Sequence, residues 1–182
     1  WGRFRNHFGF IGRFGDDDLG ELSRTSLTSL GIDVSRSTTV DGATNQFAVV
    51  LVDVAAARAR AREADEALAR GEIWGPLHGV PFTVKDVFET AGVVSPLDRQ
   101  LRLRGDPKHD ATVVERMRDA GAILIAKSNC PPNGSGVDSE NTVIGRTLNP
   151  YDLNCTPGGS SGGEAALVAS GCSPIGIGND QS

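Results

Sequence analysis

The apolar residues of the chain form short continuous runs, separated by longer stretches of mixed polarity. Runs of this length are typical of strands that are buried on both faces of a sheet. We expect strands within residues 46–53, 80–87, 122–126 and 174–178. The third run, which reads AILIA, is the clearest of them because it contains no polar residue.

The stretches between these runs carry signals for the start and end of helices. Asp53 and Asp110 occupy positions where an N-cap is expected, and Gly71 and Gly121 occupy positions where the helices that follow should end. Helices that alternate with buried strands predict an α/β fold, in which a mixed central sheet is flanked by helices.

Composition narrows the class of protein. The 182 residues include 18 Lys+Arg and 23 Asp+Glu, a formal charge of −5, which argues against a nucleic-acid partner. No apolar run reaches 18 residues, so we expect no membrane-spanning helix. Cys130, Cys155 and Cys172 are odd in number and far apart, which argues against a disulfide framework or a zinc site. We therefore expect a cytoplasmic protein.

Residues 1–43 differ in composition from the rest of the chain. Five of the ten aromatic residues fall in the first fourteen positions, where arginines alternate with them. Such a pattern suits a helix that lies on a membrane surface. Four glycines among the first fifteen residues oppose that helix, since each costs up to roughly 1 kcal/mol. We interpret residues 1–43 as an N-terminal extension of uncertain structure, with membrane contact as the alternative.

The most distinctive motif is the segment 156–164, which reads TPGGSSGGE. A flexible linker is the simplest interpretation of glycine and serine together. Here, however, the motif leads directly into an expected third helix, after Gly162 and Gly163. Glycines in that setting allow close backbone approach, and exposed amides at a helix start suit an anion or an oxyanion. Glu164 is placed to interact with the dipole of that helix.

Two known loop types explain this motif poorly. A phosphate-binding loop would need a lysine after the glycines, and none follows. Residues 159–163 match the Gly-x-Ser-x-Gly pattern of a nucleophile elbow, which needs a preceding strand and a later histidine. Residues 154–157 form a poor strand, and His7, His78 and His109 all come earlier. The elbow is disfavoured, although it stays open.

Lys85 offers a base other than histidine. It lies at the end of an apolar strand, where most lysines extend their charged group to solvent. If the amine is instead desolvated, its pKa falls, and a neutral amine can accept a proton. Lys85 together with Ser160 is therefore a candidate pair for nucleophilic catalysis.

These motifs together resemble those of the amidase signature hydrolases. The lysine segment GPLHGVPFTVKD (residues 75–86) is followed, in the family's order, by AKSN (126–129), GRTLNP (145–150) and PGGSSGG (157–163). The chain closes with GIGNDQS (176–182), which is similar to the opening of the family's Asp-x-x-Gly-Ser segment. The resemblance covers about residues 44–182 and implies a partial amidase signature domain, with only the N-terminal part of the fold present.

The resemblance also implies catalytic roles. Lys85 corresponds to the terminal base, and Ser160 to a bridging serine that the family holds with an unusual cis peptide bond. Ser161 corresponds to a supporting hydroxyl. The family's nucleophile is a serine four residues after the aspartate that matches Asp180. That position lies beyond Ser182, so we expect an N-terminal fragment that is inactive by itself.

The remaining implications concern the oxyanion and the reaction. Backbone amides of the stretch from Asp180 through Gln181 to Ser182 would lie beside the oxyanion hole. Neutral Lys85 would take a proton from Ser160, which would take one from the nucleophile as it attacks an amide. The products would be a carboxylate and an amine or ammonia. The family's chemistry implies no metal and no organic cofactor; the substrate is a small amide, and a homo-oligomer stays open.

Two departures from the family's pattern affect the substrate class. Cys155 stands where many members have arginine, and Glu164 where many have serine. The glutamate is similar to the branch that contains fatty-acid amide hydrolases. On these two positions we favour a free-standing amidase. The alternatives are the A subunit of a tRNA-dependent amidotransferase, which releases ammonia from glutamine, and a non-catalytic relic. We expect Cys155 to be structural, since no histidine is placed to activate it.

Overall fold

The computed structural model describes residues 54–93, 95, 97, 107–142 and 145–180, together with the backbone of three short strands before them. Within residues 1–43 the described elements are β1 (Arg13–Gly15) and β2 (Thr38–Val40), which pair in parallel. The expected membrane-surface helix and the expected N-cap at Asp53 lie outside the described residues. None of the described helices has the length and apolar character needed to cross a membrane.

A four-stranded sheet organises the molecule, in the order β3-β5-β4-β8. Its strands are β3 (Val49–Leu51), β5 (Ile123–Ser128), β4 (Pro81–Lys85) and β8 (Gly176–Ile177). β3 runs antiparallel to β5, whereas β4 runs parallel to both β5 and β8. The expectation of a mixed sheet flanked by helices is therefore confirmed.

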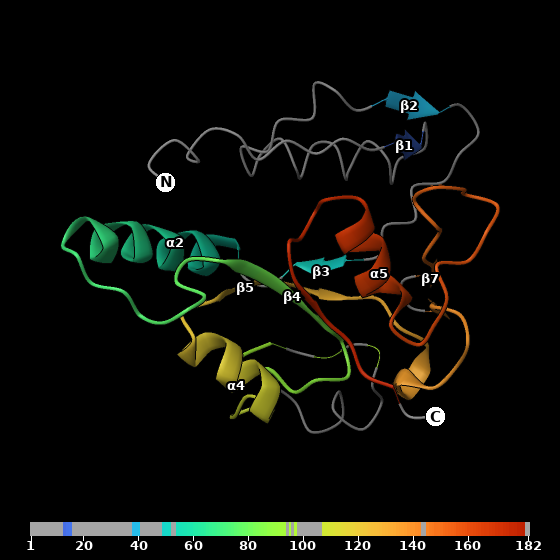
Figure 1. The fold of residues 1–182 in the computed structure, drawn as a ribbon. Coiled ribbons are helices and arrows are strands. Elements are labelled where there is room, and N and C mark those ends of the chain that lie inside the picture. The colour runs from blue at the N-terminus through green and yellow to red at the C-terminus, as the bar shows by residue number, and fades with distance from the viewer. Residues whose placement is uncertain are drawn as a thin grey trace.

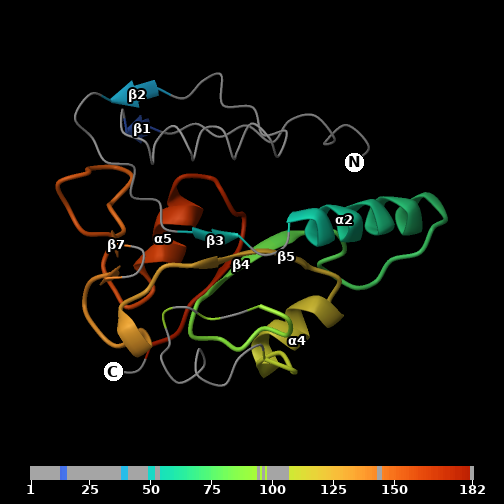
Figure 2. The same cartoon turned by 180° about the vertical axis from the view of Figure 1, so that it is seen from behind.

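Helices cover the two faces of this sheet (Figures 1 and 2). In both views α2 (Val54–Ala69) and α5 (Gly162–Ala169) lie on one side of the strands and α4 (Thr112–Asp119) on the other. Beyond β5 the chain forms a short 3₁₀ turn, η2 (Pro132–Gly134), and a small antiparallel pair, β6 (Glu140–Asn141) and β7 (Gly145–Arg146). This last segment lies next to the start of α5.

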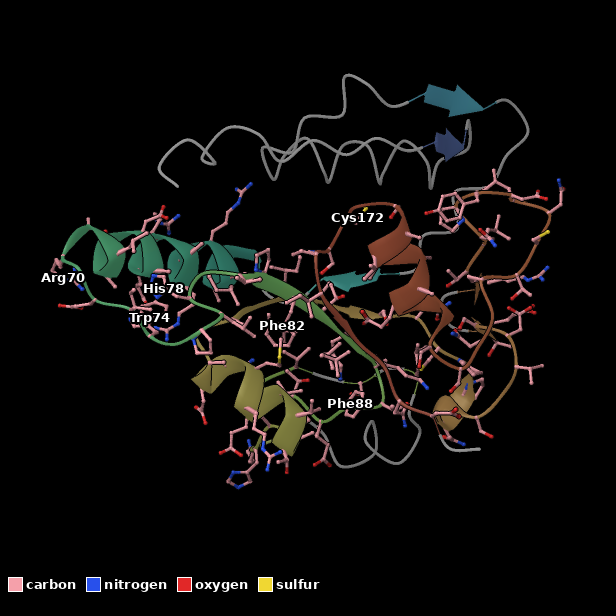
Figure 3. All side chains as sticks on the ribbon, viewed as in Figure 1. Arg70, Trp74, His78, Phe82, Phe88 and Cys172 are labelled. Atoms are coloured by element: carbon pink, nitrogen blue, oxygen red, sulfur yellow. The ribbon has the colours of Figure 1, made fainter. Side chains whose placement is uncertain are left out.

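The alternation of side chains along β4 separates an apolar face from a polar one. Phe82 and Val84 are fully buried in a core that includes Val114 of α4 (Figure 3). Thr83 and Lys85 point to the opposite face of the sheet, since successive side chains of a strand alternate. Both are also buried, and each has a side-chain partner at or just before the start of α5. The fold thus places a lysine inside the protein, on the α5 side.

The predicted N-cap of α4 is wrong. The helix is preceded by Ala111, and no side chain caps it. Asp110 instead accepts a hydrogen bond from the backbone amide of Ala91 (2.7 Å) and forms an ion pair with Arg118 (3.3 Å). Its carboxylate therefore links the turn at Ala91 to α4. Local sequence rules do not include such a contact between distant segments. The helix of residues 54–69 does end near Gly71, which has a φ of +78°.

Candidate active site

Lys85 is the last residue of β4, and its side chain is fully excluded from solvent. Its Nζ lies 2.5 Å from the Oγ of Ser160 and 2.7 Å from the Oδ1 of Asn179. Burial lowers the pKa of Lys85, because the ammonium loses hydration, while Cys130 and Asp180 act in the opposite direction. The sequence analysis gave this direction as the alternative to an amine that extends to solvent. A lowered pKa favours the neutral amine that a base requires.

Ser160 lies in the loop immediately before α5, whose first residue is Gly162. The peptide bond between Gly159 and Ser160 is cis. The helix starts at Gly162 and so includes both glycines that the sequence placed before it. Ser160 is half-buried, with its hydroxyl directed at the lysine. The structure therefore brings together Lys85 and Ser160, two candidates that are 75 residues apart in the chain.

Two further candidates, Ser161 and Asp180, lie near this pair. Ser161 donates a hydrogen bond to the backbone oxygen of Asn179 (3.0 Å) and accepts one from its backbone amide (3.3 Å). This pairing fixes the segment after β8 beside the start of α5. Asp180 is exposed at the end of that segment. Gln181 and Ser182 lie outside the described residues.

Ser139 supports the serine loop, and no local sequence pattern pointed to it. It is fully buried, and its Oγ accepts a hydrogen bond from the amide of Gly162 (2.8 Å). The same hydroxyl faces the carbonyl oxygens of Gly158 (3.2 Å) and Ser160 (3.5 Å). Buried Asn129 in turn donates to the carbonyl of Ser139 (3.1 Å). A polar network thus holds the backbone on both sides of Ser160.

The glycines of the loop are required by close backbone contacts. A Cβ at Gly159 would lie 2.6 Å from the backbone nitrogen of Asp138, and one at Gly162 would lie 2.6 Å from Ser139 Oγ. At Gly163 it would collide with the backbone of Asn129. The loop therefore packs tightly against neighbouring backbone, which excludes the interpretation of the motif as a flexible linker.

Glu164 has a different environment from the one expected at a helix start. It lies in the first turn of α5, but its side chain is buried and accepts a hydrogen bond from the Thr83 hydroxyl (2.5 Å). Burial raises the pKa of Glu164 to about 7, and the hydroxyls of Thr83 and Ser128 act against this shift. Among the described residues Oε1 has no hydrogen-bond partner, so the Thr83 hydroxyl, which bonds Oε2, is the stronger of these two contacts.

This burial predicts that Glu164 makes the fold less stable as pH rises. Below a pKa of 4.5, its ordinary value, the group is protonated in the folded and unfolded chains alike, and it has no pH-dependent cost. Between 4.5 and about 7 only the unfolded chain releases the proton, so stability falls, and above 7 the loss is complete. At 1.36 kcal/mol per unit, the loss is about 3 kcal/mol.

Glu164→Gln should therefore remove this pH dependence. We expect its free energy of unfolding in urea, relative to the parent chain, to increase between pH 5 and pH 8 by about 2.5 kcal/mol. Glu115→Gln, at an exposed position of α4, is the matched control and should not show the increase. Parallel pH profiles for the parent chain and Glu164→Gln would contradict the assignment.

A second buried cluster includes Asp86, the residue directly after Lys85 in the chain. Lys127 and Asp86 have no solvent exposure, and Nζ lies 3.6 Å from Oδ1. Lys127 also donates to the carbonyl of Phe88 (2.9 Å) and to the Ser95 hydroxyl. Asp86 accepts from the amide of Leu97 (3.0 Å). This ion pair anchors the turn that follows Lys85, and no local sequence pattern predicted it.

The cysteines differ in their relation to this site, and Cys130 is the one that affects the pKa of Lys85. None of the three is in a disulfide, and Cys155 is exposed rather than part of a packed core. It donates to the Oδ2 of Asp152 (3.3 Å), and this carboxylate raises the pKa of the thiol. A raised pKa disfavours the reactive thiolate. Among the described residues, no group of three His, Cys, Asp or Glu side chains is arranged to hold a metal ion.

The mixed sheet with helices on both faces defines an α/β protein. Its candidate active site is a desolvated lysine, at the end of a parallel strand, in contact with a loop serine. Comparison with known families identifies the class more closely. The chain belongs to the amidase family, the amidase signature hydrolases, whose model matches residues 34–182. The family resemblance of the motifs is therefore confirmed.

Individual relatives fall into two groups. Among curated proteins, the A subunit of glutamyl-tRNA(Gln) amidotransferase from Acidothermus cellulolyticus is 42% identical over 160 residues, which are 88% of this chain and 31% of the relative. Among solved structures, one described as an amidase has a TM-score of 0.65 at 34% identity and covers 89% of this chain and 34% of its own. The chain thus spans about a third of the length of these relatives.

A further solved structure comes from work on a vestigial protein complex and the evolutionary origin of an s-triazine catabolic enzyme. It has a TM-score of 0.70 at 32% identity, and covers 88% of this chain and 33% of its own. Relatives of this family thus include complex subunits as well as enzymes described without partners.

Proposed function

We propose that these residues form the proton-transfer half of a serine hydrolase that cleaves carboxamide C–N bonds. The observation that carries the proposal is the 2.5 Å contact between the buried Lys85 amine and the Ser160 hydroxyl. The serine that would attack the amide lies, by the family's motif, four residues after Asp180 and is not among the 182 residues. Below, the complete polypeptide is the full-length chain that contains these residues and that serine.

In the proposed reaction, neutral Lys85 accepts the proton of Ser160, and Ser160 accepts the proton of the nucleophile. The nucleophile oxygen bonds to the amide carbon, and the carbonyl electrons move onto oxygen, where backbone amides near Asp180 stabilise the charge. As the C–N bond breaks, the proton returns through Ser160 to the leaving amine. Water then attacks the acyl-enzyme with the same base and releases the carboxylic acid.

A second candidate is favoured by the comparisons. The curated relative named above belongs to an amidotransferase, and it matches 88% of this chain. On this similarity, release of ammonia from glutamine within a multi-subunit complex is supported at least as well as a free-standing amidase. Glu164 and Cys155, on which the sequence favoured the free-standing enzyme, do not outweigh it. Their side chains face Thr83 and Asp152, respectively.

Partner dependence distinguishes the two candidates. The complete polypeptide is assayed for ammonia release from glutamine and from simple aliphatic and aromatic amides, alone and with the remaining amidotransferase subunits and tRNA. A free-standing amidase should hydrolyse a simple amide alone at its full rate. An amidotransferase component should release ammonia from glutamine only in the assembly. Absence of hydrolysis under every condition would contradict both and favour a non-catalytic relic.

A further inference from the structure

Asn179 makes a contact with Lys85 that neither the family motif nor the proposed roles include. Its side-chain Oδ1 lies 2.7 Å from Nζ, on a segment 94 residues away in the chain. Asn179 is half-buried, whereas its neighbours Gly178 and Asp180 are exposed. The lysine therefore has two oxygen partners from two different segments, one of which is the Ser160 hydroxyl.

We propose that Asn179 is a positioning residue, whose side-chain carbonyl holds one N–H of Lys85 so that the nitrogen lone pair faces Ser160. The inference rests on the proposed function for its catalytic meaning. A neutral amine has two N–H bonds and one lone pair, and the Cε–Nζ bond can rotate among three staggered arrangements. A carbonyl oxygen accepts an N–H but cannot donate to the lone pair. Of the two oxygen partners, only the Ser160 hydroxyl can donate to it.

The backbone around Asn179 makes this geometry reproducible. Ser161 Oγ bonds both the carbonyl and the amide of Asn179, so the segment after β8 is fixed to the loop that carries Ser160. These bonds use main-chain atoms of Asn179. A change in its side chain removes the contact with Lys85 and leaves this attachment in place.

The side-chain amide of Asn179 carries no charge, and this affects the pKa of Lys85 as much as its position does. A carboxylate at the same place would pair with the ammonium and keep Lys85 protonated. Other charged or titratable groups near the lysine are the Cys130 thiol, the Asp180 carboxylate, Glu164 through Thr83, and the Asp86–Lys127 pair. All of these are unchanged in variants at position 179, so the amide can be tested separately.

The test measures the pKa of Lys85 directly in the 182-residue chain. The chain has three lysines, so ¹³Cε-lysine labelling yields three NMR signals to titrate. Asn179→Leu removes the acceptor, which stabilises the ammonium more than the amine, and should lower the pKa of Lys85 by roughly half to one pH unit. Asn179→Asp adds a charge at the same place and should raise it by about one unit or more. Exposed Lys108 is the internal reference.

Shifts of opposite sign in the two variants would support the inference. Unchanged titration of Lys85 in both, or shifts of the same sign, would overturn it. Asn154→Leu and Asn154→Asp are matched controls, since Asn154 is exposed and bonds Asp152 instead. Asn179→Ala replaces the leucine variant if that chain does not fold, as judged by the Lys127 signal.

Kinetics of the complete polypeptide separate this inference from the proposed function. Asn179→Leu should lower kcat more than it changes KM, and it should move the acid limb of the pH profile to lower pH. Absence of amide hydrolysis, combined with opposite NMR shifts, would reject the proposed function and keep the geometry of Lys85. Hydrolysis that depends on Lys85, without NMR shifts, would reject the role of Asn179 alone.

Discussion

Lys85→Ala is expected to lower the turnover of the complete polypeptide by at least about a thousandfold, with folding preserved. The amine is fully buried and 2.5 Å from Ser160, so no solvent group can replace it as a base in the resting site. Ser160→Ala should have an effect of similar size, because it interrupts the same proton path. Initial rates of ammonia or amine release on the best amide substrate measure both losses.

Two further variants serve as controls, one at position 85 and one at an exposed lysine. Lys85→Met keeps the length of the apolar stem and should be as inactive as the alanine variant, without the same loss of packing. Lys108→Ala removes an exposed lysine and should retain full turnover. Near-normal turnover in a folded Lys85→Ala protein would reject the assignment of Lys85 as the base.

We expect the largest loss of stability when the buried ion pair between Lys127 and Asp86 is broken. Lys127→Met removes the cation that faces Asp86, and both side chains have no solvent exposure. Breaking a buried pair from one side leaves an uncompensated charge, so the free energy of unfolding should fall by about 3–5 kcal/mol. Urea unfolding of the 182-residue chain, followed by circular dichroism, measures the change.

The same cluster allows a check by a double-mutant cycle. Because removal of both charges leaves no unpaired ion, Lys127→Met with Asp86→Asn should lose less than the sum of the single variants. Lys108→Met is the exposed control and should change stability by no more than about 0.5 kcal/mol. Additive losses in the double variant would show that the two side chains do not interact energetically.

Much of the site could be predicted before the structure, because its chemistry lies in local motifs. Lys85 follows an apolar strand, and the glycines around Ser160 mark a loop where backbones approach closely. Both features are properties of a few adjacent residues. The resemblance to the amidase signature hydrolases then supplied the expected roles of these residues, and the family is confirmed over residues 34–182. The catalytic roles themselves stay predictions.

Other parts of the site depend on contacts between distant segments. Asp110 had the local pattern of an N-cap, but its carboxylate bonds Ala91 and Arg118 instead. Glu164 had the pattern of a residue that stabilises a helix start, yet it is buried against Thr83, 81 residues earlier. In each case tertiary packing offered the carboxylate a partner that local propensity does not take into account.

The sequence by itself determined the order of the four central strands and the three helices between them, the mixed α/β class and the two motifs that supply Lys85 and Ser160. Periodicity and glycine placement are encoded within a few residues, which is why they can be read directly. Only the tertiary structure decided that Asn179 reaches the lysine and that Ser139 supports the serine loop. These contacts arise because parallel strands β4 and β8 and the start of α5 meet in space, and their separation along the chain leaves no local pattern.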